Sequence, residues 1–407
     1  MSTLAPSPAR PAHRDPAYLR FTTGQAISVL GDQIWYVALS WAAVKLASPG
    51  VAGMVLTVSS IPRLVLLLFG GVFVDRFGPK RLMIGSDLLR TAVALGAAAI
   101  ALAAPSIGLL VAVGLVFGVV SAVFMPASGA MTPLLLREEQ LTGGVALRTL
   151  TARLALTLGA PLGGAIVAIG GLPLAATVDA ATFLLSAATL WTLRPREVAA
   201  GRRPRGGTRA ALTEGLRYLW RHRLLRDLHL TGLFINLGFV GPMNVGLAVL
   251  SQQRGWGAVG IGGMLAGFGG GAAASALLLL RVKPKRALGY RIAACALVQA
   301  VAVLGLGLAP NLWVAVAITV VIGLVSGVMG VLLGSLVQAN TDDAFRGRVS
   351  SVSNVLDFGI TPLAMAATGF GVSAFGLSAT FAASAGLLAV GGSLAVWRSE
   401  TRDATLA

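Results

Sequence analysis

Residues Gly71 to Arg81 read GVFVDRFGPKR and separate two long apolar runs. Gly78 can adopt a positive φ, Pro79 fits the first turn of a following helix, and Asp75 stands where a carboxylate can meet a helix N-terminus. Short loops rich in Lys and Arg lie on the cytoplasmic side of membrane proteins. The stretch therefore predicts a tight cytoplasmic turn between two membrane helices.

The composition of the whole chain supports a membrane protein. Of its 407 residues, 56% are hydrophobic and only 12% are charged, and its mean hydropathy of +0.82 excludes a soluble globular protein. A net charge of +17 would suit nucleic-acid binding if the basic residues shared a soluble face. Instead, all but Lys45, Arg63 and Arg254 lie in or near alternate loops. This placement predicts both termini in the cytoplasm and no nucleic-acid partner.

Apolar runs of about 20 residues, which span ~30 Å of hydrocarbon, occur twelve times. We predict helices at 20–45, 51–74, 82–104, 107–134, 147–170, 173–194, 227–250, 257–281, 287–309, 312–339, 348–371 and 374–397. Short outer loops of Gly and Pro predict tight hairpins. Gly pairs four residues apart, such as Gly330 and Gly334, predict close helix packing.

Internal similarity between the two halves predicts the arrangement of these helices. Residues 118–122 match 323–327, and Ile27 matches Ile235 in the same relative position of the first and seventh runs. We therefore expect an all-α polytopic membrane protein with twelve transmembrane helices in two pseudo-symmetric six-helix bundles. The expected units are a disordered cytoplasmic tail at 1–17, an N-terminal bundle at 18–194, a cytoplasmic linker with an amphipathic segment at 195–226, a C-terminal bundle at 227–398 and a cytoplasmic tail at 399–407.

Ionisable residues within the apolar runs are functional candidates, because a charge at mid-membrane costs roughly 2.5 kcal/mol or more. Asp32 lies near the bilayer centre, and Arg63 lies at a similar depth on the next run. We predict that the two form an ion pair, which is either a static bridge or a site that protonation of Asp32 opens. Asp179 and Asp357 are further candidates for proton coupling, although each could instead hydrogen-bond a neighbouring helix.

Asp87 and Arg90 lie three residues apart on one helical face near the cytoplasmic surface. A local ion pair is the simplest interpretation.

Polar, aromatic and methionine side chains on several of the runs predict a mostly apolar substrate cavity for an amphipathic organic compound. Each of these residues could equally well pack inside a bundle. These residues are Gln25, Ser28, Trp35, Tyr36, Ser121, Met125, Ser128, Asn236, Met243, Asn244, Ser326 and Met329.

Other chemistries lack the residues that they need. The single cysteine, Cys295, excludes a disulfide framework or a zinc cluster. The histidines His13, His222 and His229 are interpreted as solvated loop residues. No nucleophile, base and orienting group can be assembled, so we expect no enzyme, no cofactor and no metal.

The stretch at 71–81 resembles the loop between the second and third helices of major facilitator superfamily transporters, in the pattern G-x-x-x-D-R-x-G-x-K-R. Within that superfamily the chain is similar to bacterial drug and macrolide exporters and siderophore exporters. The segments that carry this similarity are Thr22 to Trp41, Asp87 to Arg90, Val178 to Ala180 and Arg346 to Val349.

The resemblance implies alternating access driven by proton entry, in the bacterial cytoplasmic membrane and with small-molecule substrate, protons and the lipid bilayer as partners. A monomer is expected. In the superfamily, Asp75 would dock near Arg346 to Ser350 and close the cytoplasmic side. The gating residues that the resemblance implies are Gly71, Asp75, Arg76, Gly78, Lys80, Arg81, Asp87, Arg90, Arg346 and Arg348.

One departure from the motif of related exporters weakens the assignment of this chain as an antiporter. Related exporters carry G-P-x-x-G-G, whereas this chain has its proline one place late, at Pro161 within Gly159 to Gly164. A proton-coupled uptake permease and a non-transporting membrane receptor or scaffold remain alternatives.

Overall fold

The structure is a computed structural model that describes residues 11–67, 70–196, 208–282, 286–397, 399–402 and 404–405. Within these ranges the chain forms helices and no strand. Eleven of the described helical segments are long and apolar enough to cross a membrane. Parts of the predicted tail at 1–17 and linker at 195–226 lie outside the described residues, namely 1–10 and 197–207. The described part of the tail holds η1 and the start of α1, and the described part of the linker holds α7 and the start of α8.

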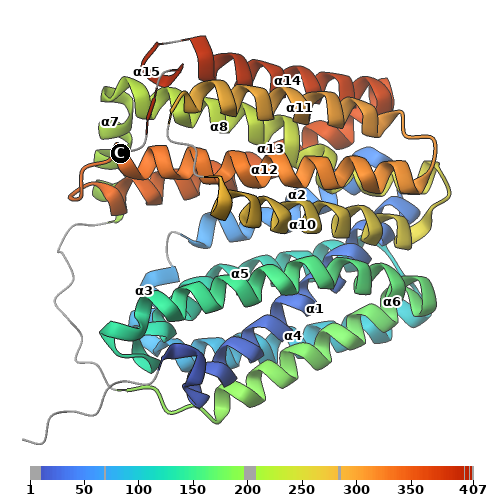
Figure 1. The fold of residues 1–407 in the computed structure, drawn as a ribbon. Helices are drawn as coiled ribbons and strands as arrows, with labels where there is room; N and C mark the ends of the chain where they lie inside the picture. Colours follow the sequence, from blue (N-terminus) through green and yellow to red (C-terminus); the bar gives the residue numbers. More distant parts are fainter. Residues whose placement is uncertain are drawn as a thin grey trace, which may run out of the picture.

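Helices fill both halves of the chain (Figure 1). The first half holds η1 Ala12–Arg14, α1 Pro16–Leu46, α2 Pro49–Leu67, α3 Gly70–Phe77, α4 Pro79–Ala103, α5 Ile107–Leu135, η2 Glu138–Gln140 and α6 Leu141–Trp191. The second half holds α7 Thr208–Arg221, α8 Arg223–Gly241, the π-helical η3 Pro242–Gly246, α9 Leu247–Gln253, α10 Gly257–Arg281, α11 Leu288–Gly307, α12 Leu312–Ala339, α13 Arg346–Phe375, α14 Leu377–Trp397 and α15 Ser399–Arg402.

Helix α6 crosses the membrane twice. The total number of crossings is therefore twelve, as hydropathy predicts. Gly171 has φ 63° and ψ −156°, so the helix reverses there. A Cβ on Gly163 would lie 2.9 Å from the Cα of Ile34, so residues 141–170 run alongside α1. Gly31 of α1 adjoins Thr182, and Gly24 adjoins Thr189, so residues 172–191 return antiparallel to α1.

The predicted turn at 71–81 is wrong in extent. Residues 70–77 form α3, and the turn is confined to Gly78, whose φ of 78° ends α3 before Pro79 begins α4. The buried Val74 packs in a cluster with Phe21 and Met83, which explains why this stretch continues as a helix. The side chain of Asp75 lies outside the described residues.

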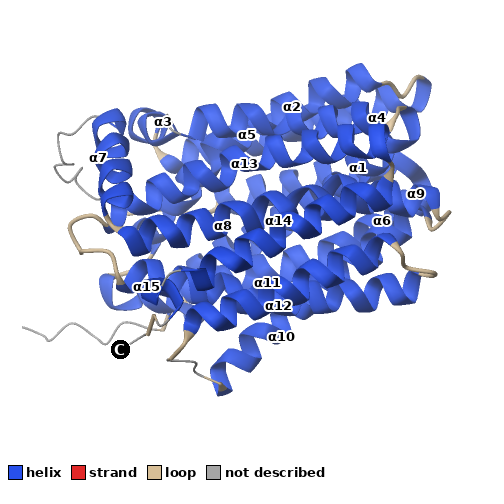
Figure 2. Ribbon diagram, turned by 90° about the horizontal axis from the view of Figure 1, so that it is seen from above, coloured by secondary structure: helices blue, strands red, loops and turns tan. Residues whose placement is uncertain are grey.

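The helix ends divide the molecule into two faces. We call the face with the connections at 137–140, 192–196 and 286–287 the basic end, after Arg194, Arg196 and Arg286. We call the face with the connections at 104–106 and 308–311 the opposite end. Figure 2 shows α3, α7 and α15 at the basic end and α9 at the opposite end.

Two seams join the halves, and they are related by the internal repeat. Helix α2 packs on α13, and α6 packs on α10. A Cβ on Gly53 would lie 2.8 Å from the Cα of Gly369, and one on Gly164 would lie 3.2 Å from the Cα of Gly262. Small residues let helix backbones approach closely in lipid, so both seams close through glycine near the opposite end.

Contacts on the pseudo-symmetry axis confirm the relation between the halves. Tyr36 hydrogen-bonds Asn244, which lies 208 residues further along the chain. Gln252 donates to the carbonyl of Val44, again 208 residues apart, over 2.7 Å. Residues in equivalent positions of a two-fold repeat meet on its axis, so these contacts support two pseudo-symmetric bundles.

Candidate functional site

A buried arginine lies at the centre of the first bundle. Arg90 of α4 is 1% exposed and is among the largest fully buried side chains. Its Nη2 donates to Asp87 Oδ1 over 2.7 Å, and its Nη1 donates to Asp32 Oδ1 of α1 over 3.4 Å. The guanidinium carbon lies 4.4 Å from the ring centre of Phe124 and 4.2 Å from that of Phe183. Two aromatic faces and two carboxylates therefore hold the cation in place.

A third carboxylate belongs to this group, which we call the acidic cluster: Asp32, Asp87, Arg90 and Asp179. Asp179 of α6 is fully buried, and its Oδ2 has no hydrogen-bond partner. A Cβ on Gly31 would lie 2.5 Å from Asp179 Oδ1, so a glycine beside Asp32 makes the space for this carboxylate. Two carboxylates thus pair with one guanidinium, and a third lies buried beside them.

Only Asp32 connects the acidic cluster to open space. Its side chain is 37% exposed, whereas those of Asp87 and Arg90 are 0% and 1% exposed. The same face of α1 carries Gln25, which accepts a hydrogen bond from Ser128 of α5, and Tyr36, which bonds to Asn244. This face is directed at the region between the bundles.

The predicted pair of Asp32 with Arg63 is wrong. Arg63 Nη2 lies 2.8 Å from Met125 Sδ, and its guanidinium carbon lies 4.7 Å from the ring centre of Phe358 on α13. The reason lies in the helix packing. Helix α2, which carries Arg63, packs on α5 and on α13 of the other bundle. Helix α4 packs on α6, which in turn packs on α1, and this brings Arg90 to Asp32. The predicted Asp87–Arg90 pair is confirmed, but it is deeply buried rather than near the surface.

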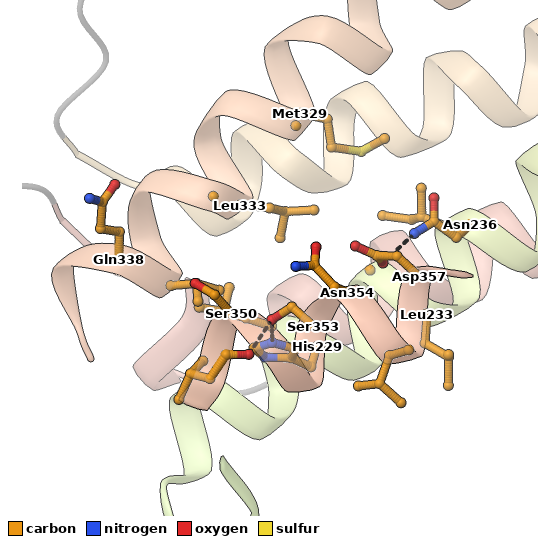
Figure 3. Close-up of a pocket in the computed structure, with 18 of the residues that line it drawn as sticks. His229, Leu233, Asn236, Met329, Leu333, Gln338, Ser350, Ser353, Asn354 and Asp357 are labelled. Atoms are coloured by element: carbon orange, nitrogen blue, oxygen red, sulfur yellow. Dashed lines mark hydrogen bonds between the residues drawn. The ribbon is translucent and has the colours of Figure 1, made fainter. Parts of the chain in front are cut away.

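The second bundle carries a cavity of about 660 Å³ between α8, α11, α12 and α13 (Figure 3). Three of the predicted cavity residues line it, namely Asn236, Ser326 and Met329. Gly330 and Gly334 also line it, and a Cβ on either would meet nothing within 4 Å. Their predicted role in close packing is therefore wrong, because they widen the cavity instead.

Polar side chains of α8 and α13 bond across the wall of this cavity. Asn236 Nδ2 donates to Asp357 Oδ1 over 3.0 Å, and His229 Nε2 lies 2.7 Å from Ser353 Oγ. His229 was expected in a solvated loop, but it lies on α8 and lines the cavity. Its four-residue spacing from Leu225 and seven-residue spacing from Asn236 on one face is the signal that could have located it.

The other predicted cavity residues have different surroundings. Trp35 packs on Phe117 with ring centres 5.4 Å apart. Ser28 and Met243 are buried, Met125 is exposed beside Arg63, and Ser121 is half-buried.

Apart from the buried Asp87 and Arg90, the predicted gating residues lie around the basic end, and the partners of their side chains are within their own bundles. Lys80 Nζ donates to the carbonyls of Trp191 and Leu193 over 2.9 and 2.6 Å. Arg346 pairs with Asp343 and Arg348 with Glu214. Arg76 and Arg81 are exposed, Arg76 lies over the ring of Phe77, and Gly71 is within α3.

Hydrogen bonds between the bundles lie at mid-depth and toward the opposite end. Besides Gln252 and Tyr36, Gly50 N donates to Ser373 Oγ over 2.8 Å, and Thr57 Oγ1 donates to the carbonyl of Pro362 over 3.1 Å. The cavity of the second bundle extends from Ser326 at mid-depth to Thr341 at the basic end. Among the described residues, no group of three or more His, Cys, Asp or Glu could hold a metal ion.

Known proteins similar to this chain are transporters rather than enzymes. The multidrug efflux pump Tap of Mycobacterium tuberculosis is 29% identical over 427 aligned residues, which cover 98% of this chain and 97% of that protein. The enterobactin exporter EntS of Shigella boydii is 27% identical over 307 residues, which cover 74% of this chain and 71% of that protein.

Solved structures share the fold at low sequence identity. The nucleoside transporter NupG has a TM-score of 0.73 at 14% identity, covering 92% of this chain and 98% of that one. A D-xylose-proton symporter has a TM-score of 0.69 at 14% identity, covering 96% and 98%. The sequence profile of the Major Facilitator Superfamily matches residues 21–360. With the twelve crossings and the two seams described above, these matches show that the chain belongs to the Major Facilitator Superfamily.

Proposed function

We propose that this chain is a proton-coupled secondary transporter that exports a small amphipathic organic compound by alternating access. The observation that carries this proposal is the acidic cluster, in which one buried guanidinium pairs with Asp87 and Asp32 beside the buried carboxylate of Asp179, and Asp32 is the member that reaches open space. Both bundles come from one chain, so we propose a monomer as the working unit.

The names of the similar proteins support the direction of transport. Tap is an efflux pump and EntS is an exporter. We therefore propose a drug, a macrolide-like natural product or a siderophore as the exported class. A mainly apolar cavity with a few amide and hydroxyl groups suits such compounds.

The placement of charge supports an orientation in the bacterial cytoplasmic membrane. Loops rich in Lys and Arg stay in the cytoplasm, so the basic end would be cytoplasmic and both termini with it. The contacts between the bundles then close the periplasmic side while the cavity opens inward. An exporter loads its substrate in this state. The basic residues around Lys80 and Arg346, with Asp75, would close the cytoplasmic side in the other state.

Charge balance supports Asp32 and Asp179 as the proton-binding groups. With all carboxylates ionised, the acidic cluster would bury more negative than positive charge, and uncompensated charge inside a membrane protein is strongly unfavourable. A bound proton removes part of that excess. When Asp32 loses its proton, its attraction to Arg90 draws α1 toward α4, and when it regains the proton that attraction ends. Protonation thus shifts the populations of two conformations. Arg63, placed on the α2–α13 seam, would transmit this shift to the second bundle.

Proteoliposomes test the proposal. Wild type, Asp32→Asn and the exposed control Glu139→Gln are reconstituted with ethidium as the probe and an imposed pH gradient. We expect Asp32→Asn to lower gradient-driven ethidium transport at least tenfold while ethidium counterflow, which needs no net proton movement, continues. The control should transport like the wild type.

Three outcomes would overturn parts of this assignment. Unchanged gradient-driven transport in Asp32→Asn would exclude coupling through this residue. Flux with the proton gradient rather than against it would indicate uptake. No movement of ethidium by the wild type, together with unchanged drug susceptibility of an efflux-deficient host that produces it, would favour a non-transporting receptor.

A further inference from the structure

His229 of α8 lies between two oxygen atoms of the second bundle. Its Nδ1 lies 2.8 Å from the carbonyl oxygen of Leu225, and its Nε2 lies 2.7 Å from Ser353 Oγ on α13. The hydroxyl of Ser353 is also 3.0 Å from the carbonyl oxygen of Val349. Figure 3 shows His229, Ser353 and Asp357 along the same wall of the cavity.

This arrangement accepts the imidazole in either protonation state. A carbonyl oxygen can only accept, so Nδ1 carries a hydrogen in both states. When the ring is neutral, the Ser353 hydroxyl donates to Nε2. When the ring is protonated, Nε2 donates to Ser353 Oγ, and the hydroxyl turns to donate to the carbonyl of Val349. A proton can therefore bind or leave with one hydroxyl rotation and no movement of the helices.

Few other charged groups face this histidine. The ionisable residues that line the cavity are His229, Arg346 at its basic end and Asp357. Helices α12 and α14 carry no ionisable side chain, and Gln299 is the polar residue that α11 contributes. On α7, Glu214 pairs with Arg348 of α13. The α8 residues Arg226 and Asp227 pair with each other. Glu400 and Arg402 of α15, which also packs on α8, do not line the cavity.

Asp357 is the acidic group of the cavity and lies one turn beyond Ser353 on α13, about 6 Å along the helix axis. It is exposed to the cavity, and its recorded hydrogen bond comes from the neutral amide of Asn236. No basic side chain of the described residues lies within ion-pair distance of it. A cation that enters the cavity can therefore pair with Asp357, with the ring of Phe239 and the side chains of Met329 and Leu333 for its apolar part.

We propose that His229 is a second proton-binding site of this protein, and that it exchanges its proton for an amphipathic cation bound at Asp357. This inference deepens the proposed export function and rests on it for its role in transport. Two positive charges in one partly dehydrated cavity repel each other, so each weakens binding of the other by the same factor. When the cation binds, the Nε2 proton passes to water at the basic end, and the Ser353 hydroxyl turns to donate to Nε2.

Binding measurements on the purified full-length protein test this exchange without any gradient. The probe is tetraphenylphosphonium, whose charge does not change with pH, and neutral triphenylphosphine oxide is the comparison. Isothermal titration calorimetry from pH 5.5 to 8.5, in buffers of different ionisation enthalpy, gives Kd and the number of protons released. In the pH range where His229 is protonated, we expect the Kd of the cation to rise about tenfold for each unit by which the pH is lowered. About one proton should be released per cation bound, because one proton competes with one ligand.

Two matched histidine variants assign the effect. His229→Gln should bind the cation with a Kd that no longer depends on pH. His222→Gln should behave like the wild type, because His222 is exposed and lies against Tyr218 outside the cavity, with ring centres 4.0 Å apart. Asp357→Asn should lose affinity for the cation and keep it for the neutral compound. The three histidines of the chain also allow ¹⁵N-histidine NMR to follow His229 directly, with His229→Gln assigning its signal.

A pH slope that persists in His229→Gln, or a His229 signal that does not change on addition of the cation, would overturn the proposal. Failure of wild type to bind tetraphenylphosphonium would overturn it as well. Asp32→Asn in the same assay separates this inference from the proposed coupling. In Asp32→Asn the Kd of the cation should depend on pH as in the wild type. This result is expected whether or not Asp32 couples transport to protons, so the binding assay tests His229 independently of Asp32.

Discussion

The two bundles share a fold but place their ionisable groups in opposite environments. In the first bundle, Arg90 and Asp87 are almost fully buried and are neutralised by contact with each other and with Asp32. In the second, His229 and Asp357 line a cavity, and their hydrogen bonds are to the neutral Ser353 and Asn236. The first arrangement suits a permanent pair of Arg90 with Asp87, beside which Asp32 alone can exchange a proton with open space. The second suits groups that exchange their partners.

The repeat explains how this difference arises. The spacing of 208 residues that joins Tyr36 to Asn244 also aligns Ser28 of α1 with Asn236 of α8. Ser28 is buried in the first bundle, whereas Asn236 binds a carboxylate at the cavity of the second. Equivalent backbone positions thus carry different chemistry, because packing within each bundle and not the repeat itself decides which side chains meet water.

The largest effect is expected from Arg90→Met, which would leave the buried carboxylates without their cation. Breaking a buried ion pair by removing one partner typically costs about 3–5 kcal/mol. The free energy of unfolding in detergent, measured by chemical denaturation, should fall by that amount. Arg63→Met is the matched control on the seam, where the contacts with the ring of Phe358 and the sulfur of Met125 are lost, and should cost about 1 kcal/mol. Equal losses in the two variants would contradict a special role for burial in the first bundle.

The cavity of the second bundle can be filled without disturbing its walls. A side chain at Gly330 meets open space, so Gly330→Leu should fold normally and lower the affinity for tetraphenylphosphonium at least tenfold, about 1.4 kcal/mol. Gly386→Leu on the exposed face of α14 is the control, since a Cβ there also meets nothing within 4 Å. Wild-type affinity in Gly330→Leu would place the binding site elsewhere.

Asp357→Asn should hardly change stability, in contrast to the loss expected at Arg90. Its carboxylate is exposed and is held by one hydrogen bond from Asn236, and such bonds contribute about 1 kcal/mol. The thermal unfolding midpoint in detergent measures this. A loss as large as that of Arg90→Met would show that Asp357 is a structural group.

The smallest effect is expected at the exposed pair of Arg348 and Glu214. Their side chains are 40% and 51% exposed, and their charged atoms are 3.3 Å apart. Exposed ion pairs contribute about 0–1 kcal/mol. A double-mutant cycle of Arg348→Ala and Glu214→Ala should therefore give a coupling energy within that range. A larger coupling would mean that α7 is fixed to α13 by more than surface charge.

Much of the architecture could be predicted from the sequence. Hydropathy located the crossings, including both halves of α6, and the matching motifs indicated two related bundles. The stretch at 71–81 identified the superfamily, although most of it is helix rather than turn. The candidate site was predicted less well. Asp32 was chosen as a candidate from its depth, but its partner is Arg90, not Arg63, and His229 was misplaced in a loop.

The sequence by itself determined that this protein crosses a membrane twelve times, because hydropathy is a local property that adds up along each run of about 20 residues. It also determined the family. Only the tertiary structure decided which charges meet and which face open space. Two residues at equal depth on neighbouring helices, such as Asp32 and Arg63, can point in different directions, and the rotation of each helix is set by close packing against partners distant in the chain.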